Sequence, residues 1–271
     1  MAASIEGKVA VITGGTQGLG EATARLFAER GAGGLVICGR NAERGAAVAE
    51  DISANGCKTV FVKADLGDLG QCRSVIATAD DAFGRVDILV NAAGVTDRGT
   101  ILDTSPELFD FMFTVNVRAP FFLMQDAVKI MIREAIKGTI VNIISMSGHG
   151  GQSFITAYCA SKGALQTLTR NAGYALMRNQ IRVNGLNIGW MDTPGEHRVQ
   201  MLYHGGDEDW LVKVEAGEPF GRLLKPTEVA RTIAFLASEE SGMMTGSLVD
   251  MDQTVLGCSD VQPQPTKALQ I

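Results

Sequence analysis

The chain has 271 residues, of which 46% are hydrophobic and 20% are charged, and its formal net charge is -6 at pH 7. This balance is typical of a globular protein and excludes a disordered chain. The negative charge, with a pI of about 5.2, argues against nucleic acid as a partner. No apolar stretch approaches the ~18 residues that a membrane helix needs, so we expect no membrane association.

The cysteines and histidines indicate neither a disulfide nor a metal site. The five cysteines and three histidines are scattered, with no C-x-x-C pair and no Cys/His cluster. The N-terminus lacks the basic start and long apolar core of a secretion signal. We therefore expect a cytoplasmic protein with reduced thiols and no bound metal.

Short β-branched runs alternate with longer amphipathic segments along the chain. Most of the runs are continuously apolar, as expected for strands buried on both faces. We expect strands at 8–13, 34–38, 58–62, 87–90, 138–144, 181–187 and 246–251, and helices at 21–30, 42–54, 69–83, 106–133 and 156–177. This alternation predicts an α/β fold with a doubly wound, parallel seven-stranded sheet and helices on both faces.

Residues 193–218, after the sixth expected strand, interrupt this alternation. The segment is too long for a plain connector, and long insertions of this kind often form lids or binding loops. Since no repeat, linker or shift in composition marks a boundary, we expect residues 1–271 to form a single domain with a substrate lid at 193–218. The tail at 258–271 is expected at the surface or against a neighbouring subunit.

A glycine-rich turn, T-G-G-T-Q-G-L-G at residues 13–20, follows the first expected strand and opens the first expected helix. Glycines let the backbone approach a pyrophosphate, and the helix N-terminus offers free N–H groups and a partial positive charge. Glycines also serve ordinary tight turns, but dinucleotide binding requires this strand–turn–helix context. The residues expected at the cofactor phosphates are Gly14, Thr16, Gln17, Gly18, Leu19 and Gly20.

The end of the second expected strand bears on the choice of cofactor. NAD sites typically place a carboxylate there to accept a hydrogen bond from the ribose 2′-hydroxyl, whereas this chain has Arg40 and Asn41. Arg40 offers a forked donor to a 2′-phosphate; the alternative is a solvated arginine at the strand end. We expect NADP, with NAD also open, and place Asp65 and Leu66 at the adenine ring.

Tyr158 and Lys162 lie four residues apart in an expected helix and so share one face. A free tyrosine has a pKa near ~10, too high for a base at neutral pH. A fixed cation and an oxidised nicotinamide ring lower that pKa, so the pair is a candidate acid–base group. The same spacing also occurs by chance in many helices.

Two further residues favour the catalytic interpretation of that pair. Ser145 ends the fifth expected strand, at the sheet edge where ligands gather, and can hold a substrate oxygen; Ser147 is the alternative. Asn116 lies inside the expected helix 106–133, where it can kink the helix and hold a water near Lys162. The alternative for Asn116 is a buried amide bonded to a backbone carbonyl.

Together these segments resemble the short-chain dehydrogenase/reductase family, in its single-domain, Rossmann-like branch, over residues 7–252. The shared motifs are T-G-x-x-x-G-x-G at 13–20, D-L at 65–66, N-A-A-G at 91–94, N-V-R at 116–118, Ser145, and Y-x-x-x-K at 158–162. The resemblance implies that Tyr158 is the catalytic acid/base and that Lys162 binds the nicotinamide ribose and tunes Tyr158. It also implies that Ser145 orients the carbonyl and that Asn116 anchors a proton-relay water.

The resemblance also implies further cofactor contacts and an assembly. Asn91 and Gly94 are expected near the cofactor, and Thr193 at the nicotinamide amide. The family commonly forms tetramers through its long fourth and fifth helices and its last strand, so a homotetramer is expected. Ile188 stands where the family has a proline, which implies a looser nicotinamide contact, and Gln253 stands where it has a glycine.

The expected lid is more polar than a steroid or fatty-acyl pocket requires. It carries Glu196, His197, Arg198, Tyr203, His204 and Trp210. The candidate substrate-binding residues are Ser147, His149, Gln152, Arg198 and His204. This pattern favours a small hydroxyl-rich substrate such as a sugar or polyol. Recognition of an acidic group by Arg198 and His204 is a second hypothesis, and side chains that point to solvent are the alternative to both.

Three functions remain open. The first is a nicotinamide-dependent oxidoreductase that transfers a hydride to or from an alcohol or carbonyl group. The second is a 3-oxoacyl carrier-protein reductase, for which a basic patch at Arg118, Lys129 and Arg133 would be the mark. The third is a non-catalytic sensor of nicotinamide redox state, which would not need four catalytic side chains.

Overall fold

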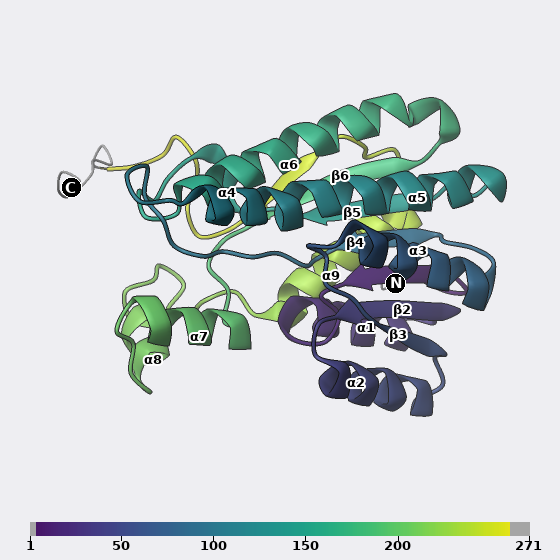
Figure 1. Ribbon diagram of the computed structural model, residues 1–271, viewed down its shortest axis with the longest axis horizontal. Helices are drawn as coiled ribbons and strands as arrows, with labels where there is room; N and C mark the ends of the chain where they lie inside the picture. The colour runs from purple at the N-terminus through teal and green to yellow at the C-terminus, as the bar shows by residue number, and fades with distance from the viewer. Residues whose placement is uncertain (1–3, 261–271) are drawn as a thin grey trace.

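The computed structural model describes residues 4–260 and contains one parallel sheet (Figure 1). We expected the tail at 258–271 to lie at the surface or against a neighbouring subunit; residues 261–271 of this tail lie outside the described residues. The strands are β1 (Val9–Thr13), β2 (Gly34–Gly39), β3 (Thr59–Lys63), β4 (Ile88–Asn91), β5 (Thr139–Ile143), β6 (Arg182–Ile188) and β7 (Leu248–Met251). Their order, β3-β2-β1-β4-β5-β6-β7, reverses between β1 and β4. A crevice at the carboxyl ends of the strands forms at such a reversal.

Helices cover both faces of the sheet, which confirms the predicted fold class. One face carries α1 (Gly18–Glu29), α2 (Ala42–Ala54) and α9 (Pro226–Ala237); the other carries α3 (Leu69–Phe83), α4 (Pro106–Phe113), α5 (Ala119–Arg133) and α6 (Thr156–Ala175). Along β1, Val11 packs against the α3–α5 side while Ile12 packs against the α1–α9 side. Because both faces are buried, the strand sequences are mostly apolar, with buried asparagines in β5 and β6 among the exceptions.

Capping side chains explain why two helices begin where the sequence predicts. The Asn41 side chain accepts a hydrogen bond from the Arg44 N–H at the start of α2, and Asp68 accepts one from the Gln71 N–H at the start of α3. Each satisfies a backbone donor that the first helical turn leaves free. Helix α3 ends at Gly84, whose φ of 70° few other residues adopt without strain.

The expected long helix at 106–133 is interrupted by a π-helical turn, Thr114–Arg118, between α4 and α5. Asn116 lies in this turn and is buried. Its Oδ1 accepts from the Val95 N–H at 3.0 Å, and its Nδ2 donates to the Val95 carbonyl and to Ser161 Oγ, each at 3.0 Å. The wide turn thus brings this amide against the loop after β4 and against α6.

The segment 193–218 folds into two short helices, α7 (Pro194–Tyr203) and α8 (Trp210–Glu215), which stand apart from the sheet beside its carboxyl edge (Figure 1). After them, Gln253 holds the returning chain: its Oε1 accepts from the Phe220 N–H and its Nε2 donates to the Arg222 carbonyl, both at 2.8 Å. Gln253, which stands where the family has a glycine, therefore anchors the chain that follows the lid. Within residues 4–260, no helix is both long enough and apolar enough to cross a membrane.

Candidate active site

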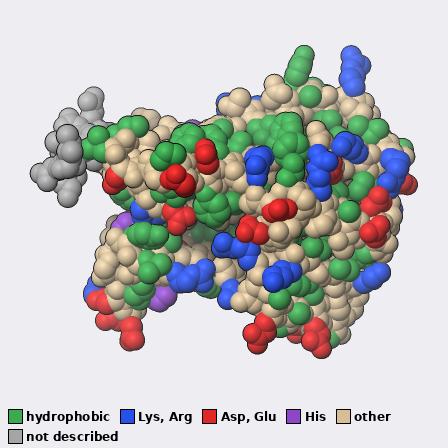
Figure 2. Space-filling view, viewed as in Figure 1, with side chains coloured by type: hydrophobic (Ala, Val, Ile, Leu, Met, Phe, Trp, Pro, Cys, Tyr) green, Lys and Arg blue, Asp and Glu red, His purple; other side chains and the backbone are tan. Residues whose placement is uncertain are grey.

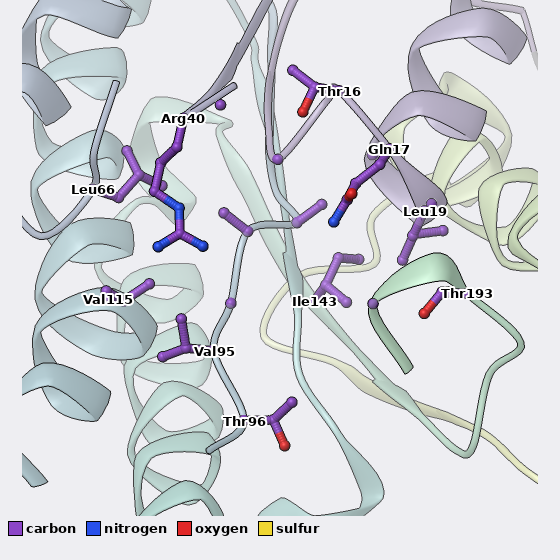
Figure 3. A pocket seen from close by; sticks show the side chains of 18 of the residues that line it. Thr16, Gln17, Leu19, Arg40, Leu66, Val95, Thr96, Val115, Ile143 and Thr193 are labelled. Carbon is purple, nitrogen blue, oxygen red and sulfur yellow. The ribbon is translucent and has the colours of Figure 1, made fainter. Parts of the chain in front are cut away.

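A pocket of about 350 Å³ opens at the carboxyl ends of the strands, where the strand order reverses (Figure 3). The residues expected at the cofactor or in catalysis that line it are Gly14, Thr16, Gln17, Gly18, Leu19, Gly20, Arg40, Asp65, Leu66, Gly94, Tyr158, Lys162, Ile188 and Thr193. They come from the turn after β1, the ends of β2 and β3, the loop after β4, helix α6 and the root of the lid. The topology thus brings most of the predicted residues to one crevice.

The glycine-rich turn is shaped for close backbone packing. A Cβ at Gly20 would lie 2.2 Å from the Gly14 carbonyl oxygen, so no larger residue fits there without moving the loop. Helix α1 begins at Gly18, on the pocket wall, so its first N–H groups lie at the pocket. This arrangement fits a pyrophosphate, which backbone donors at a helix N-terminus bind.

The end of β2 carries the residues that bear on the 2′-phosphate. Arg40 is exposed and lines the pocket, with its guanidinium on the same side as Leu66 (Figure 3). Asn41 does not line the pocket, because its side chain caps α2 through the Arg44 N–H at 2.8 Å. The structure therefore gives the Asn41 side chain a capping role beside the pocket.

Lys162 lies beneath the pocket, 4% exposed, one helical turn from Tyr158 on α6. Its Nζ donates to the Ile143 carbonyl at 3.0 Å and lies 5.7 Å from the centre of the Tyr158 ring. Burial lowers the pKa of Lys162 to about 8. The ammonium is therefore held by a single backbone acceptor at the end of β5, with donors left for a ligand.

Burial also raises the pKa of Tyr158, and this outweighs a hydrogen bond with Ser145 that lowers it. The negative charge of Glu196 also raises the pKa of Tyr158, and the positive charge of Arg98 lowers it. Both side chains therefore lie within electrostatic reach of the Tyr158 hydroxyl. The sequence predicted a lowered pKa, and the protein groups alone do not produce it. The phenol therefore favours its protonated form, ready to donate, unless a cation beside it favours the phenolate.

Ser145 is buried at the start of the turn after β5 and bonds the Tyr158 hydroxyl. Its Oγ also accepts from the Ser147 N–H at 3.1 Å. Ser147 donates its own hydroxyl to Gln152 Oε1 at 3.0 Å. Of the two serines, Ser145 is the one placed to share a substrate oxygen with Tyr158.

Gly94 lies close to two of the catalytic candidates, Asn116 and Lys162. A Cβ at this position would lie 3.3 Å from Asn116 Oδ1 and 3.5 Å from Lys162 Nζ. The glycine therefore lets the amide and the ammonium approach the loop after β4. Asn91, in contrast, is buried and outside the pocket lining, with its Nδ2 bonded to Asn142 Oδ1 at 2.8 Å. In place of the predicted cofactor contact, the Asn91 side chain links β4 to β5 through Asn142.

All five expected substrate residues lie outside the pocket lining, and three of them have other surroundings that the structure defines. Arg198 is exposed on α7 and outside the pocket lining. His149 turns toward β6 and β7, with its Nε2 3.1 Å from Asn187 Nδ2 and 3.5 Å from Asp250. His204 accepts from the Arg98 guanidinium at 2.9–3.1 Å. Protein groups thus engage both histidines in this structure.

The bond between Arg98 and His204 joins the lid to the loop after β4. The Arg98 guanidinium also lies 5.8 Å from the Tyr203 ring and 5.5 Å from the Phe154 ring. Tyr203 donates its hydroxyl to Asp97 at 3.3 Å. Cation–π contacts and hydrogen bonds of this kind hold the end of α7 against the loop after β4.

Sequence reasoning did not place Arg98 in the site, and it named Glu196 only as a polar residue of the lid. Glu196 lines the pocket together with Thr96 and Met191. No motif marks these positions, because they enter the pocket through the path of two loops. The presence of a carboxylate in the first turn of a lid helix is the only sequence signal that pointed to Glu196.

Known proteins match nearly the whole chain. A family model described as "Enoyl-(Acyl carrier protein) reductase" matches residues 14–254. Galactitol 2-dehydrogenase of Agrobacterium fabrum is 33% identical over 92% of this chain and 97% of its own. A 3-oxoacyl-(acyl-carrier-protein) reductase of Thermotoga maritima is 34% identical, with 92% and 97% covered.

A solved structure with the same fold contains both cofactor and substrate. L-sorbose reductase from Gluconobacter frateurii, complexed with NADPH and L-sorbose, superposes with a TM-score of 0.89 at 29% identity, over 96% of this chain and 100% of its own. The matched family model, the relatives and the shared fold agree with the motifs at residues 13–20 and 158–162. The chain belongs to the short-chain dehydrogenase/reductase family.

Proposed function

We propose that this protein is an NADP-preferring oxidoreductase that interconverts a hydroxyl and a carbonyl group of a sugar or polyol. The observation that carries the proposal is that Tyr158 and Lys162 line the same pocket as the glycine-rich turn, with Ser145 hydrogen-bonded to Tyr158 beside it. The galactitol and L-sorbose enzymes among the similar proteins support this substrate class. The lid at 193–218 closes the substrate side of a single catalytic domain.

The side chains divide the chemistry among them. A bound nicotinamide ring supplies or accepts the hydride. Ser145 Oγ orients the substrate oxygen, and Tyr158 Oη donates a proton to it in reduction or removes one in oxidation. Lys162 places a positive charge beside Tyr158 and favours the phenolate when the proton has left. Asn116 donates both of its amide hydrogens, one to the loop after β4 and one to Ser161, so a water that returns a proton to Lys162 would have to donate to an Asn116 oxygen.

Arg40 supports the preference for NADP. It is a cation at the end of β2, where an NAD site typically has a carboxylate, and it borders the pocket. Arg and phosphate form charge-assisted, often bidentate, hydrogen bonds. NAD remains usable because the rest of the cradle contacts parts that the two cofactors share.

The basic residues do not favour a carrier protein as the substrate. Arg118 donates to the Gly67 carbonyl at 2.6 Å, Lys129 pairs with Asp126 at 3.1 Å, and Arg133 pairs with Asp80 at 2.6 Å. Lys129 and Arg133 are ion-paired within the chain, whereas Arg118 bonds a neutral carbonyl and keeps its charge, so the three form no strong basic patch for an acidic partner. A free sugar or polyol needs no such patch.

The assembly we propose is a cytoplasmic homotetramer formed through the expected fourth and fifth helices, now α4–α5 and α6, and through β7. Hydrophobic side chains gather over α4 and α5 (Figure 2), where Phe109 and Phe121 are 45% and 44% exposed. A groove of about 660 Å³ beside them is lined in part by Phe113 and Phe122. Exposed apolar patches of this kind mark protein interfaces. The free thiols of the five cysteines agree with a reducing compartment.

A substrate panel tests the proposed function. Purified protein is assayed with sugars, polyols, hydroxyl-free ketones and a 3-oxoacyl thioester, each with NADP(H) and NAD(H). We expect the highest kcat/KM on a sugar or polyol, and a loss of about 10²–10⁴-fold in kcat in Tyr158→Phe with cofactor binding retained. Turnover of the thioester alone would favour the carrier-protein reductase, and equal rates in Tyr158→Phe would favour the redox sensor.

A further inference from the structure

We infer that Glu196 is the side chain that selects a hydroxyl-rich substrate, by accepting hydrogen bonds from hydroxyl groups near the reacting carbon. The inference rests on the proposed sugar or polyol activity and identifies the lid residue that recognises this class. Glu196 lies in the first turn of α7 and lines the same pocket as Tyr158. Its position makes it a candidate to touch the part of the substrate that the catalytic side chains do not hold.

The backbone of Glu196 is fixed at the root of the lid. Its N–H donates to Thr193 Oγ1 at 3.0 Å, and Thr193 itself lines the pocket. This bond caps α7 and ties its first turn to the chain that leaves β6. The residue therefore lies at the start of the segment 193–218, close to the point where the chain leaves β6.

One carboxylate oxygen of Glu196 is held by two donors. Oε1 accepts from Trp190 Nε1 at 2.8 Å and from Gln200 Nε2 at 2.7 Å. Gln200 is buried, and Trp190 stacks on the buried Trp210 with ring centres 6.3 Å apart. Although Trp190 is 37% exposed, its stacking and the buried Gln200 hold the two donors, and so the carboxylate is oriented before any substrate arrives.

The other oxygen of that carboxylate is available to a ligand. Within residues 4–260, no hydrogen bond to Glu196 Oε2 is formed by the protein. A carboxylate has about four acceptor positions, and the two donors on Oε1 leave those of Oε2 open. Two hydroxyl groups of a polyol can fill them.

The charge of Glu196 is felt at the catalytic hydroxyl. It raises the pKa of Tyr158, which places the carboxylate within electrostatic reach of the reacting atoms. An anionic acceptor there favours hydroxyl donors and repels a substrate carboxylate. A fatty-acyl chain offers it no donor, so its desolvation would go uncompensated. The same residue thus attracts polyols and disfavours acidic and acyl substrates.

Glu196→Gln tests the inference with little change in shape. The amide oxygen can keep the bonds from Trp190 and Gln200, while the second oxygen becomes an NH₂ donor. We expect kcat/KM for the sugar or polyol to fall about 10–100-fold, mainly through KM, because a hydrogen bond to a charged group is lost. The value for reduction of a hydroxyl-free ketone stays unchanged at neutral pH, where Tyr158 is protonated with or without the Glu196 charge, and the pH of half-maximal oxidation moves down.

Two further variants complete the experiment. Glu196→Asp keeps the charge but withdraws it by one methylene group, and we expect a smaller selective loss on the polyol. Glu208→Gln makes the same substitution at an exposed carboxylate of the segment 193–218, outside the pocket lining, and leaves both substrates unaffected. The melting temperature and NADP(H) binding of each variant show that the fold and the cofactor site are retained.

The outcomes separate this inference from the proposed function. If Glu196→Gln and Glu196→Asp turn over the polyol as the native protein does, or lose activity equally on the ketone, the inference is overturned while the proposed function stands. If the native protein accepts only hydroxyl-free substrates, both are overturned.

Discussion

Replacing Asn116 by alanine removes the amide that ties the π-helical turn Thr114–Arg118 to the loop after β4. Three hydrogen bonds are lost, two to the Val95 backbone and one to Ser161 Oγ. At a net value of about 1 kcal/mol each, the free energy of unfolding should fall by about 3 kcal/mol. For a chain of this size that corresponds to a drop in Tm of about 6–12 °C.

Urea denaturation at a fixed protein concentration measures this loss, since assembly makes apparent stability depend on concentration. The matched control is Asn55→Ala, which removes an exposed amide that bonds only to the Asp51 carbonyl of its own helix. The control should change the free energy of unfolding by less than about 0.5 kcal/mol. If Asn116→Ala proves as stable as the control, the Asn116 amide does not hold the π-helical turn against the loop after β4.

Three other variants probe the charges around the pocket. Burial lowers the pKa of Lys162 to about 8, so between that pH and its unfolded value near ~10.4 only the unfolded chain binds the proton. The native protein should therefore gain about 3 kcal/mol of stability from pH 8 to 10.4 that Lys162→Met does not gain, and equal pH slopes in denaturation would contradict this. Arg40→Ala should raise KM for NADP(H) at least about 10-fold more than KM for NAD(H), and a parallel rise would remove the 2′-phosphate argument. Arg98→Gln should weaken the contact to His204 and speed proteolytic cleavage within 193–218; an unchanged cleavage rate would show that Arg98 does not hold the lid.

The residues that the sequence placed correctly share a local signal. The apolar runs of the strands and the spacing of Tyr158 and Lys162 act over a few residues, and such signals fix helix and strand positions. In a doubly wound sheet the strand ends then meet at one edge, so the motif residues reach one pocket. The fold class and most of the cofactor cradle could therefore be predicted.

The misplaced residues depend on partners far away in the chain. Asn91 turns to Asn142, and His204 bonds to Arg98, 106 positions earlier. No local pattern marks either pairing, because it arises only when the loops have been brought together. The sequence by itself thus determined the sheet, the phosphate-binding turn and the catalytic helix. Only the tertiary structure decided which polar side chains are engaged by the protein and which, such as Glu196, keep an open acceptor in the pocket.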